Sequence, residues 1–443
     1  ATTEIYTLSL HDALPILRCS VIGGVLASND GEASEVHACP AAIRLESHLR
    51  RSWCKMRIVD VSAFYAPKGG GVRAYVDRKL AAAAALGHEI IVLAPGKHDA
   101  VIRRGPGAVL ETLASPPFPL DRRYRYFDNE KTLHRALDRW RPDFVEASSP
   151  WGSASMVARW DGAAPRALVM HADPLSAYAY RWFGPVASIE TIDRGFDFFW
   201  RHLRRLGEAY DLVVSASGEF AARLSGGGMP GVVTIPMGVE PGIFAPWHRD
   251  PHYRAALLAE CDLDPSATLL VGIGRHAAEK RWGMVIDAAL SAGTLHPIAL
   301  LLVGEGRLQG RLVARAGGSP HIRIPGPLAD RAALARLMAS ADALVHGCEA
   351  ETFCMVAAEA RASGLPVIVP DRGGAADHAD RAPSRRYRAG DVQALRDAIL
   401  AFVAGRSSVA PRALEEAPRT MDMHFAELFQ AYAALRSAVS RAA

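Results

Sequence analysis

The 443-residue sequence contains few cysteines, six in all, and no run of about 18 uncharged apolar residues. The absence of such a run predicts that no helix crosses a membrane. The cysteines form two groups, one before and one after Met56: Cys19, Cys39 and Cys54, then Cys261, Cys348 and Cys354. The second group has an odd number and no C-x-x-C spacing, so it indicates neither a disulfide framework nor a zinc site. This pattern favours a reducing, cytoplasmic location.

An excess of charge of one sign is also lacking. Lys and Arg total 51 against 47 Asp and Glu, which leaves a formal charge of +4. No global positive field therefore points to a nucleic-acid partner. Half of the residues are hydrophobic, which rules out a mostly disordered chain, and the length predicts more than one folded domain.

The first 55 residues show no helix cap and no consistent hydrophobic period, whereas a strong pattern begins at Met56. We expect 1–55 to be a non-native or disordered leader. A secretory signal peptide is the competing interpretation. It is weakened by the missing basic start and by His11, Asp12 and Pro15, which interrupt the apolar stretch.

From Met56 onward, short apolar runs alternate with segments of helical spacing, which predicts crossover units and parallel sheets. One series predicts strands at 57–62, 89–93, 144–147, 167–170, 212–215 and 232–235. A second predicts strands at 268–273, 298–303, 321–324, 343–346 and 367–370.

The two series predict two Rossmann-like, doubly wound α/β domains, 56–236 and 237–419, with a terminal helix at 420–442 that belongs to the first. The boundary is expected near 237–246, where proline and glycine accumulate. Ligands of such sheets bind at the carboxyl ends of the strands, so we expect a central cleft between the domains to hold the chemistry.

The most informative motif is Glu351-x7-Glu359, which spans a predicted helix start near Cys354 and is followed by a stop at Gly364. The N–H groups of a first helical turn attract an anion such as a diphosphate, and the flanking carboxylates can accept hydrogen bonds from sugar hydroxyls. Taken alone, Glu359 is better explained as a partner of the helix dipole, and Glu351 as a solvated loop charge.

Two cations and a glycine triplet add to this motif. Arg275 and Lys280 follow the first strand of the second domain, where they could neutralise a diphosphate leaving group, although alone they would be ordinary surface charges. Gly69, Gly70 and Gly71 allow a backbone to approach a ligand closely, as they would in any turn. The triplet is not G-x-G-x-x-G, which weakens a dehydrogenase interpretation.

Together these motifs resemble the retaining family 4 glycosyltransferases of the GT-B fold. The E-x7-E signature with its following Gly-Leu-Pro-Val carries the resemblance, and GHE at 87–89, GR-x4-K at 274–280, GEG at 304–306 and GG at 373–374 occur in the family's order. The resemblance extends from about 56 to 435.

The resemblance implies transfer of a hexosyl unit, with retention, from a nucleotide sugar such as UDP- or GDP-hexose to a glycan, lipid-linked or small-molecule acceptor in cell-envelope glycan biosynthesis. It implies that Glu359 holds the ribose and Glu351 the donor sugar. Arg275 and Lys280 would hold the diphosphate, with no metal and no further cofactor. His171, at the end of a predicted strand, would face the reacting sugar; alone, it could be a histidine that satisfies loop backbone.

The remaining donor contacts implied by the resemblance are Gly70, Gly71, Phe353, Cys354 and Met355. Cys354 departs from the family because a glycine usually stands at its position. We expect this cysteine to narrow the donor pocket or to change its backbone contacts.

A basic and aromatic segment at 196–206 could rest on an anionic membrane surface, as a peripheral contact at the inner face. A helix that packs on the core with its arginines in solvent is the preferred interpretation. Two alternatives to a glycosyltransferase stay open: a nucleotide-sugar epimerase on the same scaffold, and a non-catalytic nucleotide-sugar-binding protein.

Overall fold

The computed structural model describes residues 55–63, 65, 71–118, 124–184, 186–328, 330–405 and 417–442. These residues belong to one compact unit, which spans Trp53–Ala443. The predicted leader, apart from Lys55, and the predicted donor residue Gly70 lie outside the described ranges. In the described part of the chain, no helix combines the length and the apolar composition needed to cross a membrane.

The described N-terminal residues form an eight-stranded sheet in the order β3-β4-β2-β1-β5-β6-β7-β8. Its strands are β1 (Arg57–Ser62), β2 (Glu89–Gly96), β3 (Ala100–Gly105), β4 (Ala108–Ala114), β5 (Phe144–Ser148), β6 (Arg166–Met170), β7 (Leu212–Ser215) and β8 (Val232–Thr234). All neighbours are parallel except β3 and β4. The central strands are continuous apolar runs because both faces of a parallel sheet are covered.

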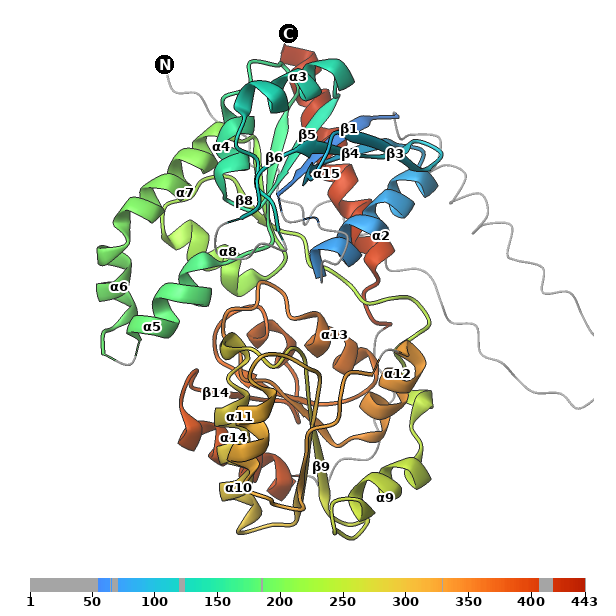
Figure 1. The fold of residues 1–443 in the computed structure, drawn as a ribbon, viewed down its shortest axis with the longest axis vertical. Helices are drawn as coiled ribbons and strands as arrows, with labels where there is room; N and C mark the ends of the chain where they lie inside the picture. The colour runs from blue at the N-terminus through green and yellow to red at the C-terminus, as the bar shows by residue number, and fades with distance from the viewer. Residues whose placement is uncertain are drawn as a thin grey trace, which may run out of the picture. The chain divides into compact units, whose positions relative to one another are not determined.

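Helices cover both faces of this sheet (Figure 1), and an apolar core lies between the sheet and the helices on each face. They are α2 (Gly71–Ala85), α3 (Glu130–Trp140), α4 (Gly152–Ala158), the π-helix η2 (Leu175–Tyr180), α5 (Arg181–Phe183), α6 (Ile189–Gly195), α7 (Asp197–Ala209) and α8 (Gly218–Gly226). Helix α7 buries Trp200, Leu203 and Leu206 and exposes Arg201 and Arg205. This segment therefore packs on the core through one face, as the preferred interpretation expects, and its other face stays exposed.

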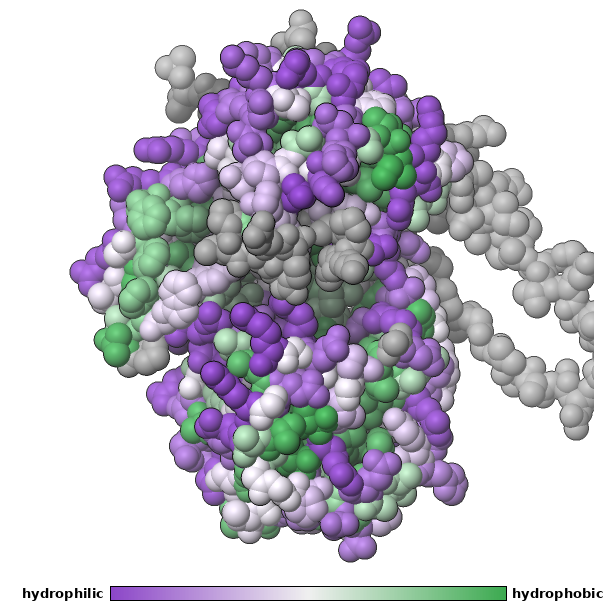
Figure 2. Space-filling model, viewed as in Figure 1, coloured by the Kyte–Doolittle hydropathy of each residue, from purple (hydrophilic) through white to green (hydrophobic). Residues whose placement is uncertain are grey.

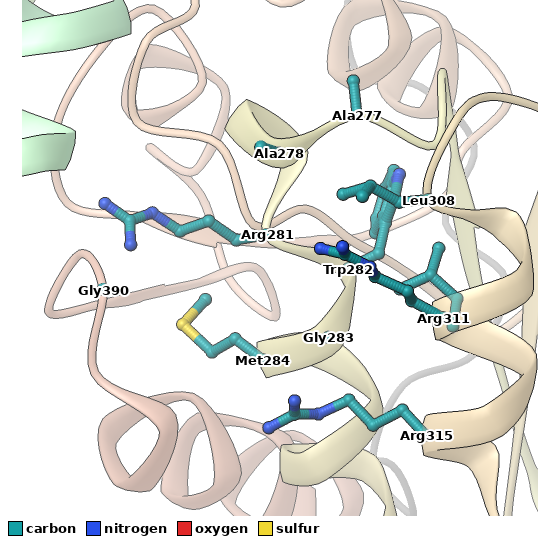
Figure 3. Close-up of a pocket in the computed structure, with 11 residues that line it drawn as sticks. Ala277, Ala278, Arg281, Trp282, Gly283, Met284, Leu308, Arg311, Arg315 and Gly390 are labelled. Atoms are coloured by element: carbon teal, nitrogen blue, oxygen red, sulfur yellow. The ribbon is translucent and has the colours of Figure 1, made fainter.

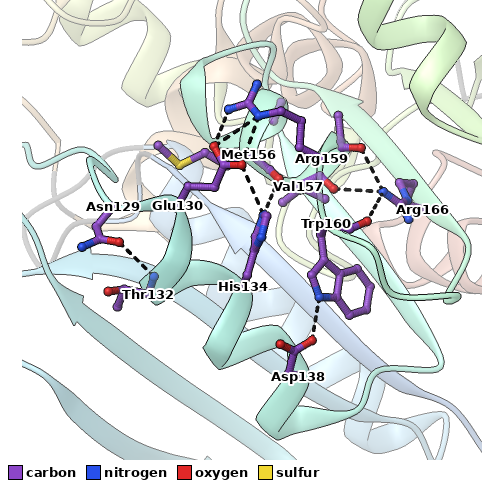
Figure 4. Close-up of polar contacts among 12 residues, drawn as sticks. Asn129, Glu130, Thr132, His134, Asp138, Met156, Val157, Arg159, Trp160 and Arg166 are labelled. Carbon is purple, nitrogen blue, oxygen red and sulfur yellow. Dashed lines mark hydrogen bonds and ion pairs between the residues drawn. The ribbon is translucent and has the colours of Figure 1, made fainter.

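Polar contacts join α3 to α4 and to the strand that follows (Figure 4). Arg159 forms an ion pair with Glu130 at 2.5 Å, and Trp160 donates from Nε1 to Asp138 at 2.8 Å. The guanidinium of Arg166 donates to the main-chain oxygens of Val157, Ala158 and Trp160, at the end of α4 and just beyond it. These contacts fix the outer layer that supports β5 and β6.

The second described sheet has six strands, all parallel, in the order β11-β10-β9-β12-β13-β14. Its strands are β9 (Thr268–Ile273), β10 (Ile298–Val303), β11 (Ile322–Arg323), β12 (Ala343–Val345), β13 (Val367–Pro370) and β14 (Arg385–Tyr387). The accompanying helices are η3 (Pro246–His248), α9 (Pro251–Ala259), η4 (Ala278–Lys280), α10 (Trp282–Gly293), α11 (Gln309–Ala316), α12 (Arg331–Ser340), α13 (Met355–Ala362), η5 (Ala376–His378) and α14 (Val392–Gly405).

The last helix, α15 (Met421–Ala442), returns to the first sheet and lies against α2 (Figure 1). Its apolar face buries Phe425, Leu428, Phe429 and Tyr432 in the core that α2 also lines. The Tyr432 ring stacks on Phe144 of β5, with 4.1 Å between the ring centroids. The C-terminal segment therefore completes the N-terminal core.

The predicted fold class of two doubly wound parallel sheets is confirmed. The sequence analysis missed β3, β4 and β14. Every residue of β3 is at least partly exposed, and β14 begins with Arg385 and Arg386, so neither shows the apolar run of an interior strand.

Candidate active site

The centre of the candidate site is an ion pair between Lys280 and Glu351. Lys280 ends the short η4 turn after β9, and Glu351 lies in the loop between β12 and α13. The Lys280 Nζ contacts Glu351 Oε1, and the two side chains are only 17% and 21% exposed. Because β9 and β12 are neighbours in the sheet, the loops after them bring the two charges together.

Burial disfavours charge on both partners, but their mutual attraction outweighs it. The Glu351 carboxylate raises the pKa of Lys280, and the Lys280 ammonium lowers the pKa of Glu351. Both shifts favour the charged forms, so the pair is ionic near neutral pH. The site holds one fixed cation and one fixed anion within reach of the same ligand.

His346, the residue directly after β12, also contacts the Glu351 carboxylate. Its fully buried ring lies with Nε2 at 3.2 Å from Glu351 Oε1, and burial lowers its pKa. Since a carboxylate only accepts hydrogen bonds, the neutral ring must donate from Nε2. Although His346 ends a predicted strand, the sequence analysis gave it no role.

His346, Glu351 and Cys354 place a nitrogen, an oxygen and a sulfur atom within 4.8 Å of one another, which is a possible ligand set for a cation. Lys280 already occupies the carboxylate, and burial together with Glu351 raises the pKa of the Cys354 thiol. A metal would have to displace both the ammonium and the thiol proton.

Close packing of two glycines fixes the loop that carries Glu351. The N–H of Gly374 donates to the main-chain oxygen of Glu351 at 2.6 Å. Gly373 has a φ of +73°, and a Cβ there would lie 2.2 Å from the oxygen of Glu349. Only glycine fits this position, which gives the Gly-Gly pair noted in the sequence a structural role.

Cys354 occupies the N-cap of α13 in the left-handed conformation, with a φ of +70° and no side-chain cap. Its side chain is 3% exposed and packs in the core of the second sheet. Phe353 is also buried, whereas Met355 is 36% exposed at the first helical position. The conformation explains why a glycine would be favourable here, and the cysteine carries the strain.

Glu359, the second glutamate of the motif, lies on α13 away from the Lys280 pair. It is 7% exposed, and Arg331 of α12 donates to its Oε1 at 2.8 Å. Burial raises the pKa of Glu359, and Arg331 opposes that shift. Arg331 also pairs with Glu240 at 3.4 Å. Sequence reasoning missed Arg331 as the partner of Glu359.

His171 follows β6 of the first sheet and reaches the Glu351 loop. Its main-chain oxygen accepts a hydrogen bond from Thr352 Oγ1 at 3.3 Å. Nε2 of its ring is buried and has no hydrogen-bond partner among the described residues. Burial, with a smaller contribution from Lys79, lowers the pKa of His171 to about 4, so the ring is neutral near pH 7. The structure thus brings His171 and Glu351 into one region.

Arg275 is not joined to this cluster by any contact in the described part of the chain. Its side chain is 73% exposed and pairs with Glu279 at 3.1 Å. Glu279 lies 3.8 Å from Arg181 of the first sheet's helices. Gly71 begins α2, and no contact in the described structure ties it to Lys280. The donor roles of Arg275 and Gly71 stay predictions.

A separate pocket of about 390 Å³ lies between α10 and α11 (Figure 3). Three arginines line it, of which Arg281 pairs with Glu349 and Arg315 with Asp287. Neither Lys280 nor Glu351 lines this pocket. It is therefore distinct from the candidate site.

Comparison with known proteins identifies relatives over both sheets. The profile of "Glycosyltransferase Family 4" matches residues 69–242, and that of "Glycosyl transferases group 1" matches residues 267–404. The "GDP-mannose-dependent alpha-(1-6)-phosphatidylinositol dimannoside mannosyltransferase" of Mycobacterium tuberculosis is 32% identical over 319 residues, 71% of this chain and 79% of that protein. A "GDP-mannose-dependent alpha-mannosyltransferase" of the same species is 30% identical over 331 residues, 73% of this chain and 81% of that protein. The sucrose-phosphate synthase structure from Thermosynechococcus elongatus superposes with a TM-score of 0.64 at 19% identity, over 87% of this chain and 98% of that one, which is a likeness in fold.

Proposed function

Since the chain belongs to the group 1 glycosyltransferases of family 4 and is a nucleotide-sugar glycosyltransferase, we propose that it transfers mannose from GDP-mannose to a mannosylated inositol lipid, with retention at the anomeric carbon. The two mannosyltransferases described above support this donor, and the first supports the acceptor. The epimerase alternative finds no support among these relatives.

The observation that carries the proposal is the Lys280–Glu351 ion pair beside His171. Departure of GDP builds negative charge on a phosphate oxygen, and Lys280 is a preorganised cation for that charge. The N-terminus of α13, just after Cys354, adds the positive end of a helix dipole, which would favour the same anion. Glu351 then accepts hydrogen bonds from the mannose hydroxyls.

His171 completes this arrangement from the other sheet. A neutral imidazole can hydrogen-bond a sugar hydroxyl without placing a second positive charge near the developing cationic character at the anomeric carbon. No described side chain is placed as a clear nucleophile. We therefore propose attack on the face from which GDP leaves, with the departing phosphate accepting the acceptor proton.

Glu359 would bind the ribose, as the family resemblance implies. In the structure its Oε1 accepts from Arg331, and its buried position leaves little room for an unpaired charge. Ribose hydroxyls would join or replace that contact. No metal is required in this scheme, since Lys280 and the helix dipole supply the positive potential.

A lipid acceptor calls for a membrane contact, and an exposed aromatic patch supports one. We define the patch as Tyr178, Trp182, Phe183, Val186, Phe196 and Phe198, of which all but Phe196 are 44–84% exposed. Ring contacts of 5.5 to 6.1 Å join Tyr178 to Trp182 in one group, and Phe183, Phe196 and Phe198 in a second. Hydrophobic side chains are visible in this region, at the left of Figure 2, where α5 and α6 lie in Figure 1.

Three arginines lie on the same helices as parts of the aromatic patch, a combination suited to anionic lipid. Arg181 lies over the Trp182 ring at 6.0 Å, and Arg201 and Arg205 are exposed on α7. Aromatic rings enter the interface while arginines pair with phosphates. We propose peripheral attachment here, at the cytoplasmic face.

A transfer assay with mass-spectrometric detection tests the proposed function. Purified protein is incubated with GDP-mannose or UDP-glucose and a phosphatidylinositol mannoside, with and without a chelator. We expect one added hexose with GDP-mannose, unaffected by the chelator. Glu351→Gln should reduce turnover by about 100-fold or more, because a contact made at the reacting sugar is lost.

The matched control is Glu260→Gln, at an exposed glutamate of the same domain. It should retain full turnover. Transfer from UDP-glucose alone would contradict the donor assignment. Equal turnover of both variants would contradict the role of Glu351.

A further inference from the structure

A chain of buried aromatic and imidazole rings runs from His171 to the C-terminal helix. The His171 ring lies edge-on to Tyr75 of α2, with 4.6 Å between the centroids and 65° between the planes. Tyr75 is 6% exposed, so its hydroxyl cannot rely on bulk water. It contacts His424 Nε2 of α15 at 3.0 Å.

The direction of these hydrogen bonds follows from their last acceptor. His424 Nδ1 lies 3.0 Å from the main-chain oxygen of Pro236, and a carbonyl oxygen can only accept. Nδ1 therefore carries the proton, Nε2 has the free lone pair, and Tyr75 donates to it. Burial lowers the pKa of His424 to about 3, so the neutral ring keeps this arrangement near pH 7.

Pro236 lies where the chain leaves the first sheet for the second. Its oxygen also accepts from Arg419 Nε at 2.8 Å, just before α15 returns. Val239 and Thr420 form a parallel bridge beside it. Two segments connect the sheets, one at Pro236 and one at Arg419, and these contacts join them. The chain of rings ends at this junction.

We infer that Tyr75 and His424 are positioning residues. They hold the His171 imidazole in a fixed orientation relative to the segments that connect the two sheets. The inference rests on the proposed role of His171. Edge-on packing restricts rotation of the imidazole, and the hydrogen bond to His424 restricts the Tyr75 ring in turn. The buried Nε2 of His171 has no hydrogen-bond partner in the described ranges, and Tyr75 supplies the ring contact that the structure gives that imidazole.

Steady-state kinetics of Tyr75→Phe, His424→Phe and the double variant test this inference. Each single change breaks the same hydrogen bond and keeps an aromatic ring. We expect kcat to fall by about tenfold, with the KM for the donor within about twofold, since misorientation affects the reacting geometry more than binding. The double variant should lose no more kcat than either single variant.

Tyr432→Phe is the matched control. It also removes one buried hydroxyl from the contact between α15 and the first sheet, where Tyr432 donates to Glu146 Oε2 at 2.7 Å. No ring contact joins Tyr432 to His171 among the described residues. Its kcat should stay within about twofold of the wild type.

His171→Gln distinguishes a failure of the positioning role from a failure of the proposed function. If it lowers kcat while Tyr75→Phe does not, the positioning role is overturned and the proposed function stands. If Tyr432→Phe and Tyr75→Phe lose kcat equally, the effect is general to the α15 contact, which also overturns it. If His171→Gln is fully active, the role of His171 in the proposed function fails, and this inference fails with it.

Discussion

Thr352 donates from Oγ1 to the main-chain oxygen of His171 at 3.3 Å, which joins the loop of Glu351 to the end of a strand in the other sheet. The N–H of Gly373 also donates to Glu219 Oε2 at 3.0 Å across the same boundary. The residues predicted to face the donor sugar from two domains are therefore neighbours. In the proposed reaction, this relationship would let one substrate contact both.

The buried ion pair leads to a prediction that separates stability from catalysis. Lys280→Met leaves Glu351 charged without its cation, and Glu351→Gln leaves the ammonium alone. Each should lower the free energy of unfolding by about 3 kcal/mol, because an unpaired charge in a largely buried site is costly. The double variant should be less destabilised than the sum of the two, yet remain inactive. Urea denaturation and the transfer assay measure the two quantities, and additive stability losses would contradict the pairing.

The lowered pKa of His171 predicts how the stability of the protein depends on pH. Its pKa is about 4 in the folded protein against 6.5 for an unperturbed histidine, so the unfolded chain binds more protons between these values. The contribution of the neutral buried ring is present above pH 6.5 and is lost as the pH falls to 4. His171→Gln should flatten the dependence by about 1.4 kcal/mol per pH unit in that window.

Denaturant unfolding at pH 4.5, 5.5 and 7 measures this difference. Glu146, whose pKa burial raises to about 7, acts in the opposite direction but is present in both proteins and cancels. Parallel curves for wild type and variant would show that His171 is not held neutral by the fold.

Some residues of the candidate site could be predicted from the sequence, and others could not. Glu351 and Lys280 could be predicted because each follows a strand of the same sheet, and strand ends of a parallel sheet share an edge. His171 could be placed by the same rule in the first sheet. Tyr75 and His424 could not, because their contact depends on α15 crossing back over 349 residues of sequence.

Two further features could not be predicted because the local sequence gives no signal for them. Arg331 looks like an ordinary helix-start arginine until α12 packs against α13 and brings it to Glu359. The exposed strand β3 carries arginines and no buried face, so hydrophobic periodicity gives no signal for it. The fold class was predictable because it depends on the interior strands, whose apolar runs are unambiguous.

Cys354 gives a prediction about strain. Cys354→Gly relieves a left-handed conformation at a gain of about 1 kcal/mol, and it loses a buried side chain at a similar cost. Stability should therefore stay within about 1 kcal/mol of the wild type, with transfer retained. Cys354→Val adds a β-branch at the same φ and should destabilise by about 2 kcal/mol. Thermal unfolding compares the three proteins, and a stable valine variant would contradict the strained geometry.

The aromatic patch predicts lipid binding that can be removed locally. Trp182→Glu and Phe198→Glu place charges among side chains that are 59% and 61% exposed. Each should weaken binding to vesicles that contain phosphatidylinositol by about tenfold or more, since the burial of one aromatic side chain is worth about 1.5–3 kcal/mol. Co-sedimentation with vesicles measures this binding.

Trp247→Glu is the control for that experiment. Trp247 is 76% exposed, lies in η3 beside the second sheet and is not part of the aromatic patch. Its substitution should leave vesicle binding unchanged. Equal losses in all three variants would indicate nonspecific adsorption rather than docking through the patch.

The central claim is that GDP leaves and the acceptor attacks from the same face of the sugar, within the site formed by Lys280, Glu351 and His171. The anomeric configuration of the mannosylated product, read by NMR from the one-bond carbon–hydrogen coupling at the new linkage, tests it most directly. We predict the α configuration of the GDP-mannose donor. A β-linked product would contradict the account.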